Sequence, residues 1–161
     1  MRDELRSSRC CFAGQIPQAL KRPEDDVKVD LENRILAAVS EGYTTFISGL
    51  SPGTDIWAAE IVVRLKTVLP RLHLVAAIPF PGFDGEWEEA WRARYRLLLS
   101  RAEYVKVLEP VFSGDAFRKR DEWMVTHSAM LIAVYGGQGG GTRDAVRRAR
   151  AGGVTVRIIP A

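Results

Sequence analysis

One segment restricts the fold of this chain more than any other: an apolar run followed by a cluster of glycines. Residues 131–135 are almost wholly apolar, which is typical of a parallel strand with both faces covered. Five of the six residues 136–141 are glycine, and residues 144–150 then have helical spacing, with Val146 and Ala149 on one face. A strand, a glycine loop and a helix in this order indicate a site that holds an anion.

The glycine cluster is the first candidate binding site. Without a Cβ, Gly139, Gly140 and Gly141 can adopt positive φ and leave room for a ligand. The free N–H groups of the next helical turn lie at the positive end of the helix dipole, which favours a phosphate. Gly137 and Thr142 complete the predicted loop. The segment has neither the Lys of a Walker loop nor dinucleotide glycine spacing, so a flexible connection capped by Thr142 is the alternative.

The rest of the chain alternates strands and helices. We expect strands at residues 10–13, 44–47, 72–78, 104–108, 131–135 and 154–159. One helix between them has an apolar stripe that ends at Val68, and another carries an aromatic stripe from Trp87 to Leu98 that is typical of core contacts. The pattern predicts an α/β, Rossmann-like, doubly wound, mostly parallel sheet of about six strands with helices on both faces.

Length and composition limit the domain organisation and the partners. With 161 residues and 47% hydrophobic content, we expect a short polar tail at residues 1–9 and a single domain at residues 10–161. A net charge of +3 is too small to favour a nucleic-acid partner by its field alone. We expect a cytoplasmic protein without a membrane partner, because no run resembles a signal peptide or a membrane span.

The cysteines and histidines indicate no redox or metal chemistry. Cys10 and Cys11 are neighbours on a predicted strand, so their side chains point to opposite faces and we expect buried thiols instead of a disulfide. Two histidines and two cysteines so widely scattered predict no metal site.

Unusual residues follow several predicted strands. In a doubly wound sheet, ligands bind beyond the carboxyl ends of the strands, near the point where the strand order reverses. Besides the glycine cluster, the candidate ligand contacts in these loops are Gly14, Gln15, Ser48, Gly49, Gly53, Asp55, Pro79 and Phe80. An ordinary strand-to-helix turn with Thr54 as N-cap is the alternative for residues 48–53. Asp55 fits a sugar hydroxyl and the helix dipole equally well.

Charged residues within the helices have two interpretations. Glu60 lies in an otherwise apolar helical stretch, so it is the candidate general base or ribose contact, and a salt bridge to an Arg is the alternative. The arginine clusters at residues 118–120 and 147–150 are expected to be solvated faces that do not bind phosphate.

Several segments resemble the YpsA-type proteins of the SLOG superfamily. They are FISGLSPGTDIWAAE at residues 46–60, AIPFPG at residues 77–82 and MVTHSAMLIAVYGGQGGGTRDAVRRAR at residues 124–150. The start CCFAGQIPQAL is similar to a degraded form of that family's Phe-Thr-Gly-His-Arg-Pro. The resemblance implies a Rossmann-like domain that binds nucleotides or nucleotide-derived ligands, often as a sensor. It also relates the chain to DprA, which binds single-stranded DNA, and to LOG enzymes, which cleave the base from cytokinin nucleotides.

The departures from this pattern concern the ligand. Ala13, Gln15 and Ile16 stand where the family has Thr, His and Arg, which weakens the binding of an anion. Asp121 stands where Asn is common. Ala145 takes the place of the glutamate that serves catalysis in LOG enzymes, so a LOG-type reaction is disfavoured.

The sequence therefore predicts a binding module as its first function. The expected partner is a nucleotide or a nucleotide-derived phosphorylated small molecule, bound at the glycine loops by a sensor or carrier, and no other cofactor is expected. The alternative is a hydrolase that cleaves an N-glycosidic or phosphoester bond of such a ligand with Glu60 as general base. Whether the protein is an enzyme stays open, and arginine-rich helices with exposed aromatics are compatible with a homo-oligomer.

Overall fold

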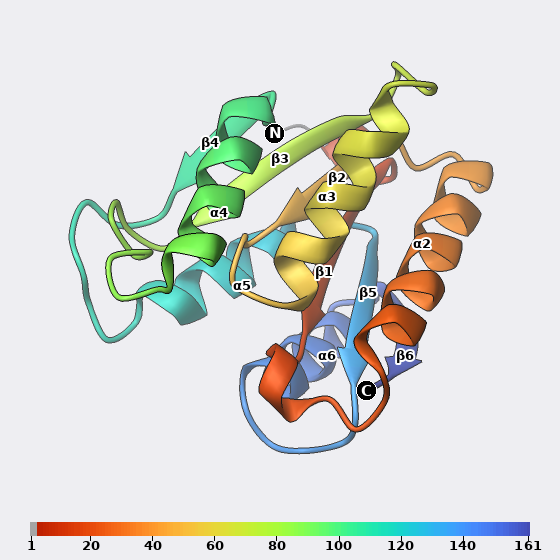
Figure 1. Cartoon of the computed structure of the whole chain (residues 1–161). Coiled ribbons are helices and arrows are strands. Elements are labelled where there is room, and N and C mark those ends of the chain that lie inside the picture. Colours follow the sequence, from red (N-terminus) through yellow and green to blue (C-terminus); the bar gives the residue numbers. More distant parts are fainter. Residues whose placement is uncertain (1–2) are drawn as a thin grey trace.

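A parallel sheet forms the centre of the computed structural model, which describes residues 3–161 (Figure 1). The strands are β1 (Arg9–Gly14), β2 (Thr45–Ser48), β3 (His73–Ile78), β4 (Tyr104–Val107), β5 (Met130–Tyr135) and β6 (Thr155–Pro160). They form a six-stranded sheet in the order β4-β3-β2-β1-β5-β6, and every neighbouring pair is parallel. The expected α/β, Rossmann-like fold is confirmed, and the sheet is parallel throughout.

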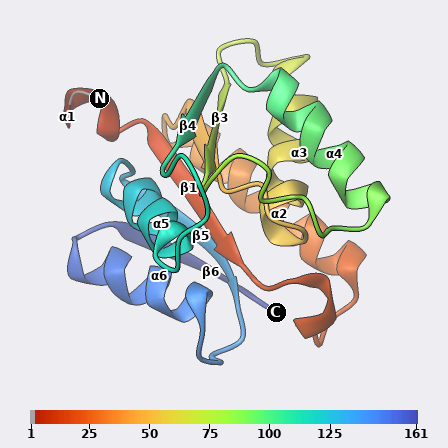
Figure 2. The ribbon, with the colours of Figure 1, turned by 90° about the vertical axis from the view of Figure 1, so that its left-hand side faces the viewer.

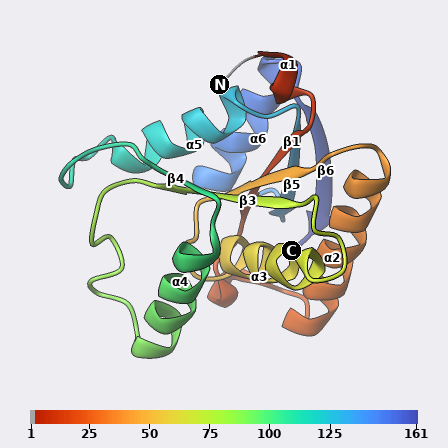
Figure 3. The same ribbon diagram turned by 90° about the horizontal axis from the view of Figure 1, so that it is seen from above.

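Helices cover both faces of the sheet, as Figure 2 and Figure 3 show. The helical elements are α1 (Asp3–Arg6), the 3-10 turn η1 (Pro17–Ala19), α2 (Glu24–Ser40), α3 (Thr54–Lys66), α4 (Glu89–Arg101), α5 (Ala116–Thr126) and α6 (Gly141–Ala151). α2, α3 and α4 lie on one face, and α5 and α6 lie on the other. Cys10 and Cys11 belong to the two different cores and are both buried and free, as expected.

The apolar stripe of α3 ends earlier than expected. We placed Val68 on this stripe, but α3 ends at Lys66 and Val68 is 73% exposed. The N–H of Val68 donates to the Leu65 carbonyl at 3.1 Å, which tightens the chain after the helix. This turn directs Leu69 against the core in place of Val68.

The aromatic stripe also begins outside its helix. α4 starts at Glu89, so Trp87 lies in the turn before it. Trp87 still packs against the core, with its ring centroid 4.9 Å from that of Phe83 and 5.3 Å from that of Tyr95. The interpretation of these aromatics as core contacts is therefore confirmed.

The strand order reverses between β1 and β5 at the middle of the sheet. The chain leaves β1 toward α2 on one face and leaves β5 toward α6 on the other. The loops after these strands consequently diverge, and such a point opens a crevice in doubly wound folds. In residues 3–161, no helix has both the length and the apolar character that a membrane crossing requires.

Candidate functional site

A cavity of about 310 Å³ lies at this reversal, lined by β1, β5, the start of α3, α5, α6 and the loops near them. Cys11 and Ala13 of β1 and Leu131 of β5 line it from the sheet. Burial raises the pKa of Cys11 to about 12, so this thiol stays protonated at neutral pH. No group of at least three His, Cys, Asp or Glu residues within residues 3–161 forms a candidate metal site.

The glycine loop lines the cavity with Gly139, Gly140, Gly141 and Thr142. Gly140 is the N-cap of α6 and has a φ of 127°, a left-handed value that favours glycine. Thr142 lies inside the first turn and makes no capping hydrogen bond, so the alternative in which it caps the helix is wrong. The N–H groups of this first turn have no partner within the helix and lie at its positive end.

The loops after β1 and β2 pack closely against each other. A Cβ placed on Gly14 would lie 2.3 Å from Thr54 Oγ1, and one on Gly53 would lie 2.9 Å from the carbonyl oxygen of Gln15. Gly53 is the N-cap of α3, while Thr54, the expected cap, donates its hydroxyl hydrogen to the Gln15 carbonyl at 3.1 Å. Gly14 and Gly53 are therefore required for this packing, which holds Gln15 beside the cavity.

Ser48 and Gly49 support the start of α3. The hydroxyl of Ser48, which is fully buried, donates to the Asp55 carbonyl at 2.8 Å and accepts the N–H of Leu50 at 3.2 Å. A Cβ on Gly49 would lie 3.0 Å from Asp55 Oδ2 and 3.1 Å from Arg120 Cζ. Glycine at this position thus allows a carboxylate and a guanidinium to approach each other beside the cavity.

The charged part of the cavity consists of Asp55 from α3 and Arg120 and Asp121 from α5. Arg120 is only 8% exposed, and its Nε donates to Asp121 Oδ1 at 3.0 Å. Its Nη1 donates to Ser51 Oγ at 3.0 Å and to the Gly49 carbonyl at 3.4 Å. Burial raises the pKa of Asp55 to about 6, an effect that Arg120 opposes and Asp121 increases.

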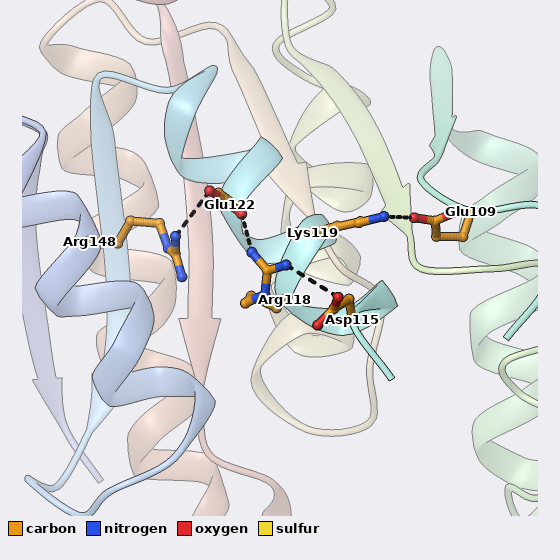
Figure 4. A network of polar contacts seen from close by, with 6 residues as sticks. All are labelled: Glu109, Asp115, Arg118, Lys119, Glu122 and Arg148. Carbon is orange, nitrogen blue, oxygen red and sulfur yellow. Dashed lines mark hydrogen bonds and ion pairs between the residues drawn. The ribbon is translucent and has the colours of Figure 1, made fainter. Parts of the chain in front are cut away.

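A network of ion pairs fixes α5 from outside (Figure 4). Glu122 pairs with Arg118 at 2.9 Å and with Arg148 of α6 at 3.4 Å, while Lys119 pairs with Glu109 after β4. The solvated-face prediction suits Arg118 and is wrong for Arg120, which points inward. Ala116, Arg120 and Met124 are all buried at steps of four, and this spacing was the available signal for an inward arginine.

The structure brings together only part of the predicted site. The predicted residues that line the cavity are Gly14, Gln15, Asp55, Gly139, Gly140, Gly141 and Thr142. Those that do not line it are Ser48, Gly49, Gly53, Glu60, Pro79, Phe80 and Gly137. The cavity is also lined by Arg120, Asp121 and Ser51, which the site prediction did not include.

Glu60 and Phe80 have other partners. Glu60 accepts hydrogen bonds from Arg94 of α4 at 2.5 and 3.1 Å, which is the salt-bridge alternative. Phe80 packs edge-on against Phe112 and Phe117, with centroids 5.4 and 5.9 Å apart. Both residues thus connect elements of the fold, and neither reaches the cavity.

The strand order and the cavity at its reversal define a Rossmann-like α/β protein, and solved structures agree. DprA from Helicobacter pylori, studied for its single-stranded DNA binding mode, superposes with a TM-score of 0.65 at 17% identity, covering 99% of this chain and 69% of that one. DprA from Streptococcus pneumoniae gives a TM-score of 0.64 at 17% identity, covering 99% of this chain and 52% of that one. Such low identity shows the fold alone.

Sequence comparison identifies the family within this class. The YpsA family model, described as the YspA SLOG family, matches residues 21–150, and the chain belongs to this family. A UPF0398 protein of Halalkalibacterium halodurans is 32% identical over 111 residues, which cover 68% of this chain and 59% of that protein. A UPF0398 protein of Oceanobacillus iheyensis is 31% identical over 115 residues, which cover 65% of this chain and 60% of that protein. The chain thus spans about three fifths of the length of these relatives.

Proposed function

We propose that this protein binds a nucleotide or a nucleotide-derived phosphorylated small molecule in the cavity between β1, β5, α5 and α6, as a sensor or carrier. One observation carries the proposal: the open glycine loop at the start of α6 and the charged residues Asp55 and Arg120 line the same cavity. A volume of about 310 Å³ lies at the lower end of the range for small-molecule sites.

The glycine loop supports a phosphate at the start of α6. A Cβ on Gly140 would have no heavy atom within 4 Å, and one on Gly139 would have only Arg143 Nη1, at 3.6 Å. Internal packing therefore does not fill the space in front of this loop. Backbone N–H groups and the helix dipole favour an anion there.

Asp55 supports the recognition of a sugar. Asp55 lines the cavity beside Ser51, whose N–H donates to Asp55 Oδ2 at 3.4 Å. An ionised carboxylate only accepts hydrogen bonds, and the hydroxyls of a ribose are suitable donors. Asp55 thus provides an orientation for a ligand whose phosphate lies at the glycine loop.

The hydrolase alternative has less support. A general base must come within hydrogen-bond reach of the reacting group or of its water. Glu60, the predicted base, is held by Arg94 and does not line the cavity. The geometry therefore favours binding over a reaction catalysed by Glu60.

Thermal melting against mono-, di- and cyclic nucleotides, NAD, ADP-ribose and a single-stranded oligonucleotide tests the proposal. A ligand at about 100 times its Kd adds roughly 2.7 kcal/mol of stability, a shift of several degrees. Gly139→Asp places a carboxylate in the loop and should abolish the shift. Gly114→Asp is the matched control, since Gly114 does not line the cavity and has open space around it. If no nucleotide shifts the wild-type transition, the proposal is wrong; a shift by the oligonucleotide alone would favour a nucleic-acid partner, as in DprA.

A further inference from the structure

A carboxylate of the protein itself lies beside the position proposed for the ligand's phosphate. Asp121 Oδ2 is 3.9 Å from the position of a Cβ on Gly141, the first residue of α6. Asp121 Oδ1 accepts the hydrogen bond from Arg120 Nε at 3.0 Å. The side chain of Asp121 thus contacts the buried arginine with one oxygen, and its other oxygen lies near the first residue of α6.

The ionisable groups that line the cavity have little positive charge to offer a ligand. They are Asp55, Asp121, Arg120 and the protonated thiol of Cys11. Arg120 donates through Nε to Asp121 and through Nη1 to Ser51 and the Gly49 carbonyl, and the carboxylate of Asp121 compensates its charge. Arg143 Nη1 lies 3.6 Å from the position of a Cβ on Gly139, but Arg143 does not line the cavity.

We infer that Asp121 sets the charge of the ligand: it restricts the site to ligands with a single phosphate and discriminates against di- and triphosphates. This inference rests on the proposed function. A phosphate at the start of α6 gains from the N–H groups and from the helix dipole, but it is repelled by the carboxylate of Asp121. Each further phosphate adds negative charge in a partly enclosed site, where repulsion is stronger than in water.

Titration calorimetry with adenosine and guanosine 5′-mono-, di- and triphosphates tests the inference in wild type, Asp121→Asn and Asp144→Asn. In wild type, affinity should fall as phosphates are added. Asp121→Asn has nearly the same shape without the charge, so it should bind the monophosphate roughly tenfold more tightly and gain more for the triphosphate. Higher salt should narrow the difference between the two proteins.

Asp144→Asn is the matched control. Asp144 lies in the first turn of α6, is exposed and does not line the cavity. Asp144→Asn removes the same charge near the start of α6 without changing a residue that lines the cavity, and we expect less than a threefold change in affinity. If Asp144→Asn relieves the discrimination as much as Asp121→Asn does, the effect belongs to overall charge and the inference is wrong.

The remaining outcomes separate the inference from the proposed function. If the ratios of affinity for mono-, di- and triphosphates are the same in wild type and Asp121→Asn, the inference is overturned while nucleotide binding stands. If none of the proteins binds any member of the series, the inference is overturned, and the wider melting panel decides separately whether the proposed function stands. Should Asp121→Asn not fold, Asp121→Ser and the salt dependence of wild type decide: wild-type affinity for the triphosphate relative to the monophosphate must rise with salt.

Discussion

The two glycine-containing loops before α3 and α6 look alike in the sequence and differ in the structure. In the loop before α3, a Cβ on Gly49 or Gly53 would come within about 3 Å of other parts of the protein. In the loop before α6, a Cβ on Gly137 or Gly140 would meet nothing within 4 Å. We call these the closed loop, residues 48–53, and the open loop, residues 136–140.

The difference shows what glycine contributes at each place. In the closed loop, glycine lets one part of the protein approach another, and the space is already used by Asp55, Arg120 and Gln15. In the open loop, positive φ at Gly137 and Gly140 shapes the turn, and the space beside these two glycines is free; a Cβ on Gly136 would meet the side chain of Gln138 in the same loop, at 2.7 Å. A glycine that is not needed for internal contacts leaves room for a ligand, and of these two loops only the open loop lines the cavity with glycines, namely Gly139 and Gly140.

The largest effect should come from Arg120, which joins the closed loop to α5. Arg120→Met removes a buried guanidinium and leaves Asp55 and Asp121 without their cation, so we expect a loss of about 3 kcal/mol at pH 7. Chemical denaturation measures this loss. Arg118→Met, on the exposed face of the same helix, should cost about 1 kcal/mol or less. Equal losses for the two variants would show that Arg120 does not hold the closed loop.

Gly14→Ala should have the next largest effect. The new methyl group would lie 2.3 Å from Thr54 Oγ1, so the packed loops must move apart and we expect a loss of about 2–3 kcal/mol. Gly139→Ala is the same change in the open loop, where Arg143 Nη1 at 3.6 Å is the nearest atom. We expect it to change the free energy of unfolding by about 0.5 kcal/mol or less. If both variants lost similar stability, the contrast between the loops would not hold.

The fold could be predicted from the sequence because its signals are local and repeated. Short apolar runs, glycine turns and helices with apolar stripes alternate along the chain, and long crossovers restrict the sheet to a parallel arrangement. Errors appeared at element ends. Val68 continues the stripe of α3 in the sequence, but the turn after Lys66 directs it to solvent, and such a change in hydrogen bonding has no clear sequence signal.

The site was less predictable because it depends on contacts between distant segments. The open loop was recognisable from its glycines alone. Arg120 lies among charged neighbours, and the choice of which one faces inward is made by packing of α5 on the sheet. For Glu60 the sequence signal was present but ambiguous. An acidic residue in an apolar helical stretch indicates that it has a polar partner, but the sequence does not show whether this partner is Arg94 or a ligand.

Asp55 should give the closed loop a pH-dependent stability. Its pKa is raised to about 6, so the folded state favours the protonated carboxyl, and this contribution is present below pH 3.8 and lost as pH rises through about 6. Asp55→Asn removes the cost of the buried charge, so it should be more stable than wild type by roughly 2 kcal/mol at pH 7 and nearly equal at pH 4. Denaturation of both proteins from pH 4 to 8 measures the difference. A gain that does not change with pH would contradict the assignment to Asp55.

Glu60→Gln should have the smallest effect, and it tests whether α3 beyond Asp55 takes part in the site. The pair with Arg94 is about one third exposed on both sides, so breaking it should cost about 1 kcal/mol or less. Arg94→Gln should cost a similar amount, and the double variant little more, because both remove one interaction. Any nucleotide found by melting should bind Glu60→Gln with unchanged affinity, since Glu60 does not line the cavity. Lost affinity in this variant, with normal affinity in Arg94→Gln, would mean that the ligand reaches Glu60 and that the division between the two loops is incomplete.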